Sequence, residues 1–304
     1  MNLKLFKTFG KFNGSFGQKM IGFIPEAFFY LKIKWILAFI KCSLKPQETM
    51  KSRMNSTSIG LLSILLLVVI VQETQAQDPP LGHLMNVTEL TIIPGHDMQF
   101  QEGIKAWKNC YLKNKGEWKW RIWRKDQGEG NVYILASDMA NWGEMDITDD
   151  SGAKCADMAR QLINQHVEKA NRQVTRFLPE ISSNVAMEDE VIGVYRFYLN
   201  QENGHKFLDI VKEVETLTAN KEGSSRHYWY VWQTSGPGTP QYHVVIPFKN
   251  YAAMDGIKGV WEIIEASEGK QKRDEIQQAF RNSIKENSYS TYKLMKDVSH
   301  TANE

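Results

Sequence analysis

The side chains of this 304-residue sequence best suited to chemistry are three histidines that its two similar halves do not share. A neutral imidazole can act as a general acid or base near neutral pH, and it can ligate a metal ion. His166 falls in an apolar pattern with helical spacing, whereas His227 and His243 sit on the strands of a predicted hairpin, where they could flank a pocket. A histidine on an apolar helical face is more often a hydrogen-bonded core residue than a ligand, so both interpretations of His166 stay open. The candidate pocket residues are His166, Trp120, Asn141, Trp142, His227 and His243.

These residues lie in a stretch of the chain that recurs 109 positions later without a gap. The repeated residues are Gly95-His96 with Gly204-His205, Trp120-x-x-Trp123 with Trp229-x-x-Trp232, Tyr133 with Tyr242, Asn141 with Asn250, and Met145-Asp146 with Met254-Asp255. Tryptophan is rare, so a paired tryptophan match is hard to obtain by chance. Repetition of this kind predicts two copies of one small unit within a single chain.

Residues shared by both halves are expected to serve the common fold rather than a single active site. We interpret His96 and His205 as residues at the start of a helix, where side-chain acceptors can satisfy free backbone N–H groups. Trp123 and Trp232 are interpreted as core residues. The repeated asparagine and aspartate would cap the second helix of each half. Shared positions are therefore predicted to be structural.

Hydrophobic periodicity predicts the order strand, helix, strand, strand, helix, strand in each half. The first half has expected strands at 87–93, 118–124, 132–137 and 174–181, with helices over 98–112 and 152–172. The second half has expected strands at 191–199, 228–233, 242–248 and 291–298, with helices over 204–217 and 262–286. This order is the ferredoxin-like motif. The fold class is therefore α+β, with tandem repeats over 87–182 and 188–300.

The hairpin tryptophans constrain how the two units meet. Trp120 and Trp123 are an odd number of positions apart, so on a regular strand they point to opposite faces of the sheet. A single unit covers only one face with helices, which would leave Trp123 and Trp232 exposed, although burying such a ring is worth ~2–3 kcal/mol. We therefore expect the two bare sheets to pack on each other within one chain, as a monomer with internal pseudo-twofold symmetry or as part of a higher oligomer.

The strand-Gly-His-helix pattern and the aromatic hairpins resemble the dimeric α+β barrel superfamily in a tandem form. The resemblance covers about residues 87–300 and extends to antibiotic-biosynthesis monooxygenases, haem-degrading monooxygenases and chlorite-dismutase-like proteins. It implies an intrachain pseudo-dimer barrel that binds a small molecule, either as a cofactor-free or as a haem-using monooxygenase. The haem-degrading branch has a histidine on its second helix near Asn and Trp, which here would be His166 with Asn141 and Trp142.

A non-enzymatic binding or structural module is the alternative, with its pockets filled by aromatic side chains. The expected pocket lies between the helices and the sheet of one repeat, because ligands favour concave apolar sites with a few polar groups. A cavity lined by His166, Trp120 and Asn141 would favour the ligand-binding interpretation. A packed space there would favour the alternative.

The segment 50–76 has the layout of a secretory signal peptide. Lys51 and Arg53 precede an apolar run of 13 residues from Ile59 to Val71, and Thr74 and Ala76 supply small residues before a cleavage site. The run is shorter than the ~20 residues of a membrane span, which makes an uncleaved anchor the weaker alternative. We expect export to the periplasm or the exterior, with residues 1–49 a mis-called extension or else a long basic leader. Residues 77–86 would be a flexible lead-in.

Removal of residues 1–76 changes the net charge from +2 to −5, because 27 basic and 32 acidic side chains remain. Without a basic stripe, nucleic acid is a poor candidate partner. The sequence lacks a nucleophile elbow, a phosphate loop, a dinucleotide fingerprint and a His-Glu-x-x-His motif. No metal site is predicted from these patterns.

Two cysteines, Cys110 and Cys155, remain in the expected mature chain. They lack the close spacing of a metal knuckle, and two lone cysteines are commonly buried free thiols. In a β-α-β-β-α-β unit the two helices run antiparallel on one face of the sheet. The end of the first helix and the start of the second can then lie close, so a disulfide also stays open.

Overall fold

Alternating apolar residues form the strands of this structure, a computed structural model that describes residues 82–128, 130–234, 236 and 238–301. The strands are β1 (Leu84–Ile92), β2 (Arg121–Lys125), β3 (Val132–Met139), β4 (Val167–Phe177), β5 (Val191–Leu199), β6 (Tyr228–Trp232), β7 (Tyr242–Phe248) and β8 (Ile284–Leu294). The expected segments 1–49 and 50–76, and the first half of the lead-in 77–86, lie outside the described residues.

These strands close into one barrel in the order β1-β3-β2-β8-β5-β7-β6-β4, and all neighbours are antiparallel. The two halves of the chain meet edge to edge, where β2 pairs with β8 and β4 pairs with β6. An open sheet leaves unpaired N–H and C=O groups along its edge strands, and closure gives those groups partners. The core expected between two stacked sheets is therefore the interior of one barrel.

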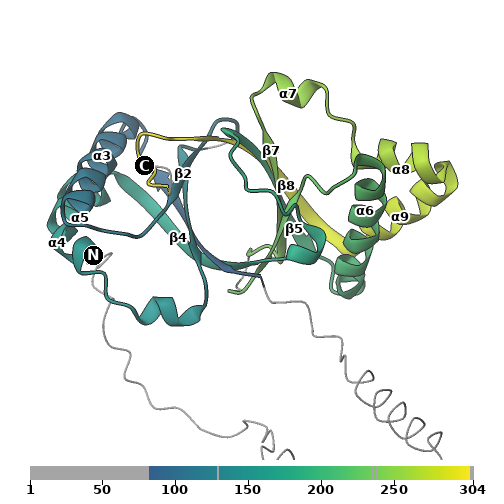
Figure 1. The fold of residues 1–304 in the computed structure, drawn as a ribbon, viewed down its shortest axis with the longest axis horizontal. Helices are drawn as coiled ribbons and strands as arrows, with labels where there is room; N and C mark the ends of the chain where they lie inside the picture. The colour runs from purple at the N-terminus through teal and green to yellow at the C-terminus, as the bar shows by residue number, and fades with distance from the viewer. Residues whose placement is uncertain (1–81, 129, 235, 237, 302–304) are drawn as a thin grey trace, which may run out of the picture. The chain divides into compact units, whose positions relative to one another are not determined.

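Helices cover the outside of the barrel on two opposite sides (Figure 1). One side carries α3 (Asp97–Lys113), α4 (Asp150–Lys154) and α5 (Ala156–Leu162). The other side carries α6 (Phe207–Glu222), α8 (Val260–Glu268) and α9 (Lys270–Ser283). Shorter helical turns are α7 (Ala252–Asp255), η1 (Trp142–Asp146), η2 (Asn164–His166), η3 (Pro179–Ile181) and η4 (Gly204–Lys206). The interior of the barrel is thus enclosed by strands and lies away from all the long helices.

Aromatic and aliphatic side chains fill the spaces between the helices and the barrel wall. On α3, the buried residues Phe100, Ile104 and Tyr111 share one face and pack with Trp120 and Tyr133. On the other side, Phe207 and Val211 of α6 pack with Phe197 and Trp229. Burying side chains of this size contributes about 1.5–3 kcal/mol each, so these two clusters attach the helices to the barrel.

The strand pairing corrects the gap-free register of the sequence repeat. Ala136 pairs with Arg121, and Val245 pairs with Tyr228. Ala136 of β3 and Val245 of β7 are 109 positions apart. Their partners, Arg121 of β2 and Tyr228 of β6, are only 107 positions apart. The structural equivalent of Trp120 is therefore His227 rather than Trp229. A shift of two residues keeps a side chain on the same face of a strand, so the prediction about faces survives the correction.

The second helix of each half is shorter than predicted. A helix was expected over 152–172, but α5 ends at Leu162 and β4 begins at Val167. The helix expected over 262–286 is divided at Gly269, which has a φ of 88°, and β8 begins at Ile284. A glycine adopts this left-handed backbone conformation without steric cost and thereby separates α8 from α9. The closing strands consequently start earlier than the sequence pattern indicated.

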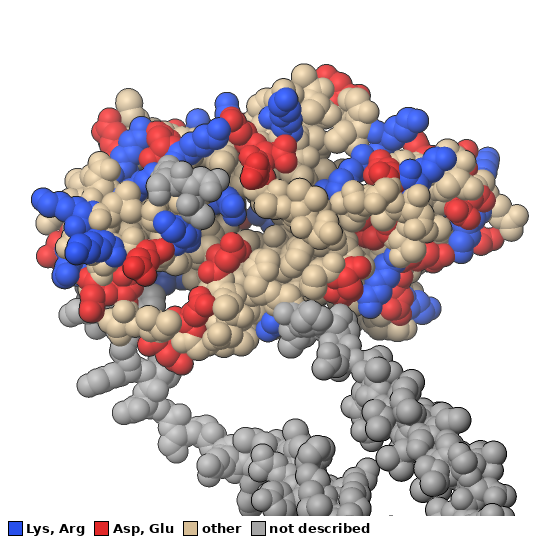
Figure 2. Space-filling view, viewed as in Figure 1, with Lys and Arg blue, Asp and Glu red and all other residues tan. Residues whose placement is uncertain are grey.

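Charged side chains of both signs are interspersed over the face shown in Figure 2, with no basic stripe on that face. Within the described residues, no helix is both long enough and apolar enough to span a membrane. These observations concern the folded barrel and its helices.

Candidate ligand-binding site

A cavity of about 110 Å³ lies inside the barrel. Its walls are the inward-facing residues of the strands, which alternate with residues that face the helices. On β1, Met85, Val87 and Glu89 line the cavity, and on β5 the corresponding residues are Ile192, Val194 and Arg196. The polar and aromatic lining includes Arg121, Trp123, Asp138, Asn171, Gln173, Tyr230, Trp232, His243 and Tyr292. A concave site with apolar walls and a few polar groups is typical of sites that bind small ligands.

His243 is a buried titratable group of this cavity. It is 6% exposed, and its ring stacks on Tyr230 with centroids 4.8 Å apart and an interplanar angle of 5°. Burial, reinforced by the nearby positive charge of Arg196, lowers the pKa of His243 to about 3. The imidazole is therefore neutral near pH 7. Burial also raises the pKa of Tyr230, so its hydroxyl stays protonated.

Two buried polar atoms of the cavity lack a hydrogen-bond partner among the described residues. These are Nδ1 of His243 and the indole Nε1 of Trp232. The two rings lie close together, with centroids 5.4 Å apart. Most buried polar side-chain atoms in proteins have a partner, and an unsatisfied one costs about 1–3 kcal/mol. These two atoms are therefore able to hydrogen-bond a molecule that enters the cavity.

An ion pair crosses the barrel beside these rings. Nη2 of Arg196 on β5 lies 3.2 Å from Oε2 of Glu89 on β1, and it also donates to the hydroxyl of Tyr292 at 3.0 Å. β1 and β5 are separated by three strands in either direction around the barrel, so the pair joins opposite walls. Glu89 and Arg196 are also equivalent positions of their strands, since Glu89 pairs with Ile134 and Arg196 with His243.

The six residues predicted to line a pocket are distributed over the molecule. His243 lines the cavity. Trp120 is buried between α3 and the barrel wall, where its Nε1 donates to the carbonyl of Val298 at 2.9 Å. Asn141 accepts from the backbone N–H of Gly143 at 2.8 Å and so caps η1, and Trp142 is 44% exposed. The space between helices and sheet, where the pocket was expected, is packed.

His166 lies in η2, after α5 has ended, and is therefore not on the second helix as predicted. Its Nδ1 lies 2.9 Å from Nδ1 of His96, so one ring must donate and the other accept. Burial, with a contribution from His96, lowers the pKa of His166. His96 makes no capping bond to α3 through its side chain, which corrects that expectation, and His205 is exposed. Both halves of the shared Gly-His motif are thus outside the cavity.

His227 belongs to a buried polar cluster beneath α6. Its Nδ1 lies 2.7 Å from Oε1 of Glu215, which is 4% exposed. The same carboxylate accepts from Nε1 of Trp229 at 2.8 Å and from the hydroxyl of Ser225 at 2.9 Å. Three donors compensate the cost of burying this charge. The arrangement holds α6 to β6 and leaves His227 no access to the cavity.

Trp123 and Trp232, interpreted from the sequence as structural, both line the cavity, as expected for the face away from the helices. The pocket candidates chosen from the sequence did not include Glu89, Arg121 or Arg196. A signal for them is present, because each lies two positions from an apolar or aromatic residue that faces the barrel interior, namely Val87, Trp123 and Val194.

The side chains do not fit a haem. The cavity is far smaller than the 300–1,000 Å³ pockets that hold drug-sized ligands. A haem is itself larger than most drug-sized ligands. His166, the predicted proximal ligand, is paired with His96 outside the barrel. Within the described residues there is also no group of three His, Cys, Asp or Glu side chains arranged to hold a metal ion. No chemistry through iron is therefore derived for this site.

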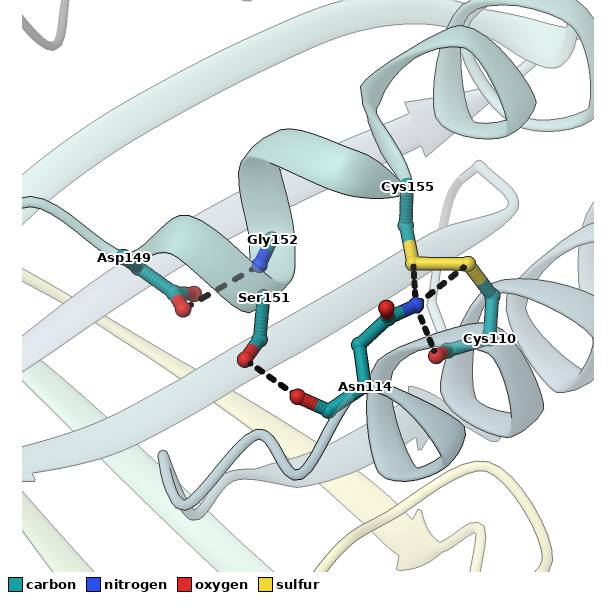
Figure 3. Close-up of a disulfide and its surroundings, with 6 residues drawn as sticks. All are labelled: Cys110, Asn114, Asp149, Ser151, Gly152 and Cys155. Carbon is teal, nitrogen blue, oxygen red and sulfur yellow. Dashed lines mark hydrogen bonds between the residues drawn. A yellow bond between two sulfur atoms is a disulfide. The ribbon is translucent and has the colours of Figure 1, made fainter.

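A disulfide joins Cys110 of α3 to Cys155, the residue between α4 and α5 (Figure 3). Their Cα atoms are 6.1 Å apart. Nδ2 of Asn114 points at the bond and donates to the carbonyl of Cys110 at 2.9 Å. Ser151 donates to the carbonyl of Asn114 at 2.9 Å, which ties α4 to the end of α3. The bond is the pairing that the sequence had left open.

The structure is a closed antiparallel barrel with helices on its outside. No family model and no curated protein matches the sequence. A proposed monooxygenase from Lactobacillus acidophilus NCFM is 14% identical, with 70% of this chain and 94% of that chain covered and a TM-score of 0.46. A haem-binding protein from Thermus thermophilus is 10% identical, with 72% and 93% covered and a TM-score of 0.41. A mutant chlorite dismutase from Candidatus Nitrospira defluvii is 6% identical, with 71% and 92% covered and a TM-score of 0.44. These likenesses concern the fold alone.

Proposed function

We propose that this protein binds a small polar molecule inside its barrel. The observation that carries the proposal is the pair of unpartnered polar atoms, His243 Nδ1 and Trp232 Nε1, in a walled cavity. An engineered apolar cavity of roughly 150 Å³ is known to take benzene, so about 110 Å³ suits a molecule of about four to six non-hydrogen atoms. The alternative of a purely structural module describes the packed helix-to-wall spaces but leaves the two polar atoms unexplained.

We further propose that the barrel is an intrachain pseudo-dimer of two ferredoxin-like repeats. Each half contributes four consecutive strands in equivalent order, β4-β1-β3-β2 and β8-β5-β7-β6. Each half also places its first helix between its first two strands and further helices before its last strand. The cavity between the halves would then be the counterpart of a subunit interface, completed within one chain.

Titration of the full-length protein with butyramide tests the binding proposal. This amide has six non-hydrogen atoms and can both donate and accept. We expect a saturable shift of the Trp232 indole N–H resonance, identified with a Trp232→Phe sample. The expected Kd is millimolar, because six atoms supply about 4 kcal/mol at an intermediate ligand efficiency.

Two alanine-to-leucine variants control this titration. Ala136→Leu fills the cavity and should abolish the shift, whereas Ala140→Leu places the same side chain at an exposed position outside it. The proposal fails if neither butyramide nor its carboxylate analogue butyrate moves the Trp232 resonance. It also fails if Ala136→Leu binds as well as the unmodified protein.

Export is the third part of the proposal. The signal-like segment 50–76 indicates it, and the disulfide supports it, because such bonds persist in oxidising compartments. Expression in a host that secretes the protein should yield a mature chain beginning at Gln77, as determined by mass spectrometry. An Ala76→Leu variant should remain uncleaved, because the residue before the cleavage site must be small. A full-length chain with free thiols in the cytoplasm would contradict export.

A further inference from the structure

Some of the hydrogen-bonding groups that face the cavity already have partners, and others do not. Among the oxygen acceptors, Gln173 Oε1 accepts from Thr234, and Asn171 Oδ1 accepts from Gln173 at 3.0 Å. Glu89 accepts from Arg196. These three side chains therefore already have donors within the described part of the chain.

Two donors, in contrast, remain without an acceptor among the described residues. Trp232 Nε1 is buried and has no hydrogen-bond partner there. The guanidinium of Arg121 lines the cavity and makes neither an ion pair nor a hydrogen bond there. The indole N–H of Trp232 and the guanidinium of Arg121 can only donate, so a molecule that binds both should bring oxygen acceptors.

The charged lining residues are two carboxylates, Glu89 and Asp138, and two guanidinium groups, Arg121 and Arg196. Glu89 is paired with Arg196, and Asp138 lies 3.4 Å from Nε2 of His83. This contact with His83, with a smaller contribution from the charge of Arg121, holds the pKa of the Asp138 carboxyl below its usual range. Arg121 is left as the cavity-lining cation that makes no ion pair with a carboxylate among the described residues. A guanidinium offers a planar set of donors that matches a carboxylate.

We propose that the ligand of this cavity is a small monocarboxylate whose oxygens bind Arg121 and Trp232. The inference rests on the proposed function and names the chemical class of its ligand. Part of the lining, including Val87, Val194 and Val245, is apolar and suits a short hydrocarbon tail. A chain of about four carbons is the longest that the cavity volume favours.

Butyrate and butyramide provide a matched pair of probes, since they share size and shape and differ in charge. In the full-length protein we expect butyrate to shift the Trp232 indole resonance with a Kd at least tenfold lower than that of butyramide. In Arg121→Gln the preference should fall below threefold. Arg172→Gln is the matched control, because Arg172 is exposed on β4 between the inward-facing Asn171 and Gln173. This control should keep the full preference.

The outcomes separate the two proposals. Equal affinity for both probes, or a preference that survives Arg121→Gln, overturns the carboxylate inference and leaves small-molecule binding intact. A shift with neither probe overturns both, and leaves the cavity as a site for ordered water only. Folding of each variant is checked by the remaining indole resonances, which should keep their positions.

Discussion

Replacing both Cys110 and Cys155 with alanine is expected to lower the free energy of unfolding by about 4 kcal/mol, because the disulfide closes a loop of 45 residues. Most of this loss arises in the unfolded chain, which gains conformational freedom once the loop is open. The native contacts change less, since α3 remains attached to the barrel through Phe100, Ile104 and Tyr111. The measurement is urea unfolding of the oxidised protein and of the double variant.

A reductant distinguishes the bond from the side chains themselves. Dithiothreitol should destabilise the unmodified protein by nearly the same amount and should leave the alanine double variant unchanged. If the oxidised protein carries two thiols that react with iodoacetamide under native conditions, the bond is absent and the expectation is contradicted. If reduction has no effect on a bonded protein, the loop-closure explanation is incorrect.

The sequence predicts strands well where alternation is strong. The bounds expected for β5 and β7 coincide with those observed, because apolar residues on both faces of Val191–Leu199 and Tyr242–Phe248 permit little else. The second helix of each half was predicted to be longer than it is, for a local reason. Ile163, His166 and Val167 continue the helical period of α5 by chance, yet Val167 already pairs with Ile92 of β1. Only a long-range contact decides between helix and strand at that point.

The cavity could be predicted only in part, since it depends on closure of the barrel. The opposite faces of Trp120 and Trp123 indicated a second core, and that core contains the cavity. The ion pair between Glu89 and Arg196 joins residues 107 positions apart on opposite walls. No local pattern in the sequence relates these two side chains, so the chemistry of the interior stayed hidden.

This ion pair also explains what a single chain gains over a symmetric dimer. In a dimer of identical subunits, equivalent positions across the axis carry the same residue, so Glu89 would face a second glutamate. Like charges at such a distance repel each other. A chain with two different halves can place glutamate on one wall and arginine on the other. The interior can therefore be polar and asymmetric, which suits a site that orients one ligand.

The native state is expected to lose stability relative to a His243→Phe variant as the pH falls below 6.5. The pKa of His243 is lowered to about 3 by burial, whereas an unfolded histidine titrates near 6.5. Between these values the unfolded chain binds a proton that the native state does not bind, so acid favours unfolding. The contribution of neutral His243 to the free energy of unfolding is fully present above about pH 6.5. Below about pH 6.5 it declines by about 1.4 kcal/mol per pH unit, which amounts to about 2 kcal/mol by pH 5.

Urea unfolding of both proteins at pH 7 and pH 5 measures this difference. Phenylalanine keeps the ring stacked on Tyr230 and removes the titrating group, so the variant should lose about 2 kcal/mol less than the unmodified protein over this interval. Val245→Ala, which also changes the cavity wall, should be destabilised equally at both pH values, because it alters no titrating group. An identical pH dependence in the unmodified protein and in His243→Phe would show that His243 is hydrated and able to take up a proton in the native barrel.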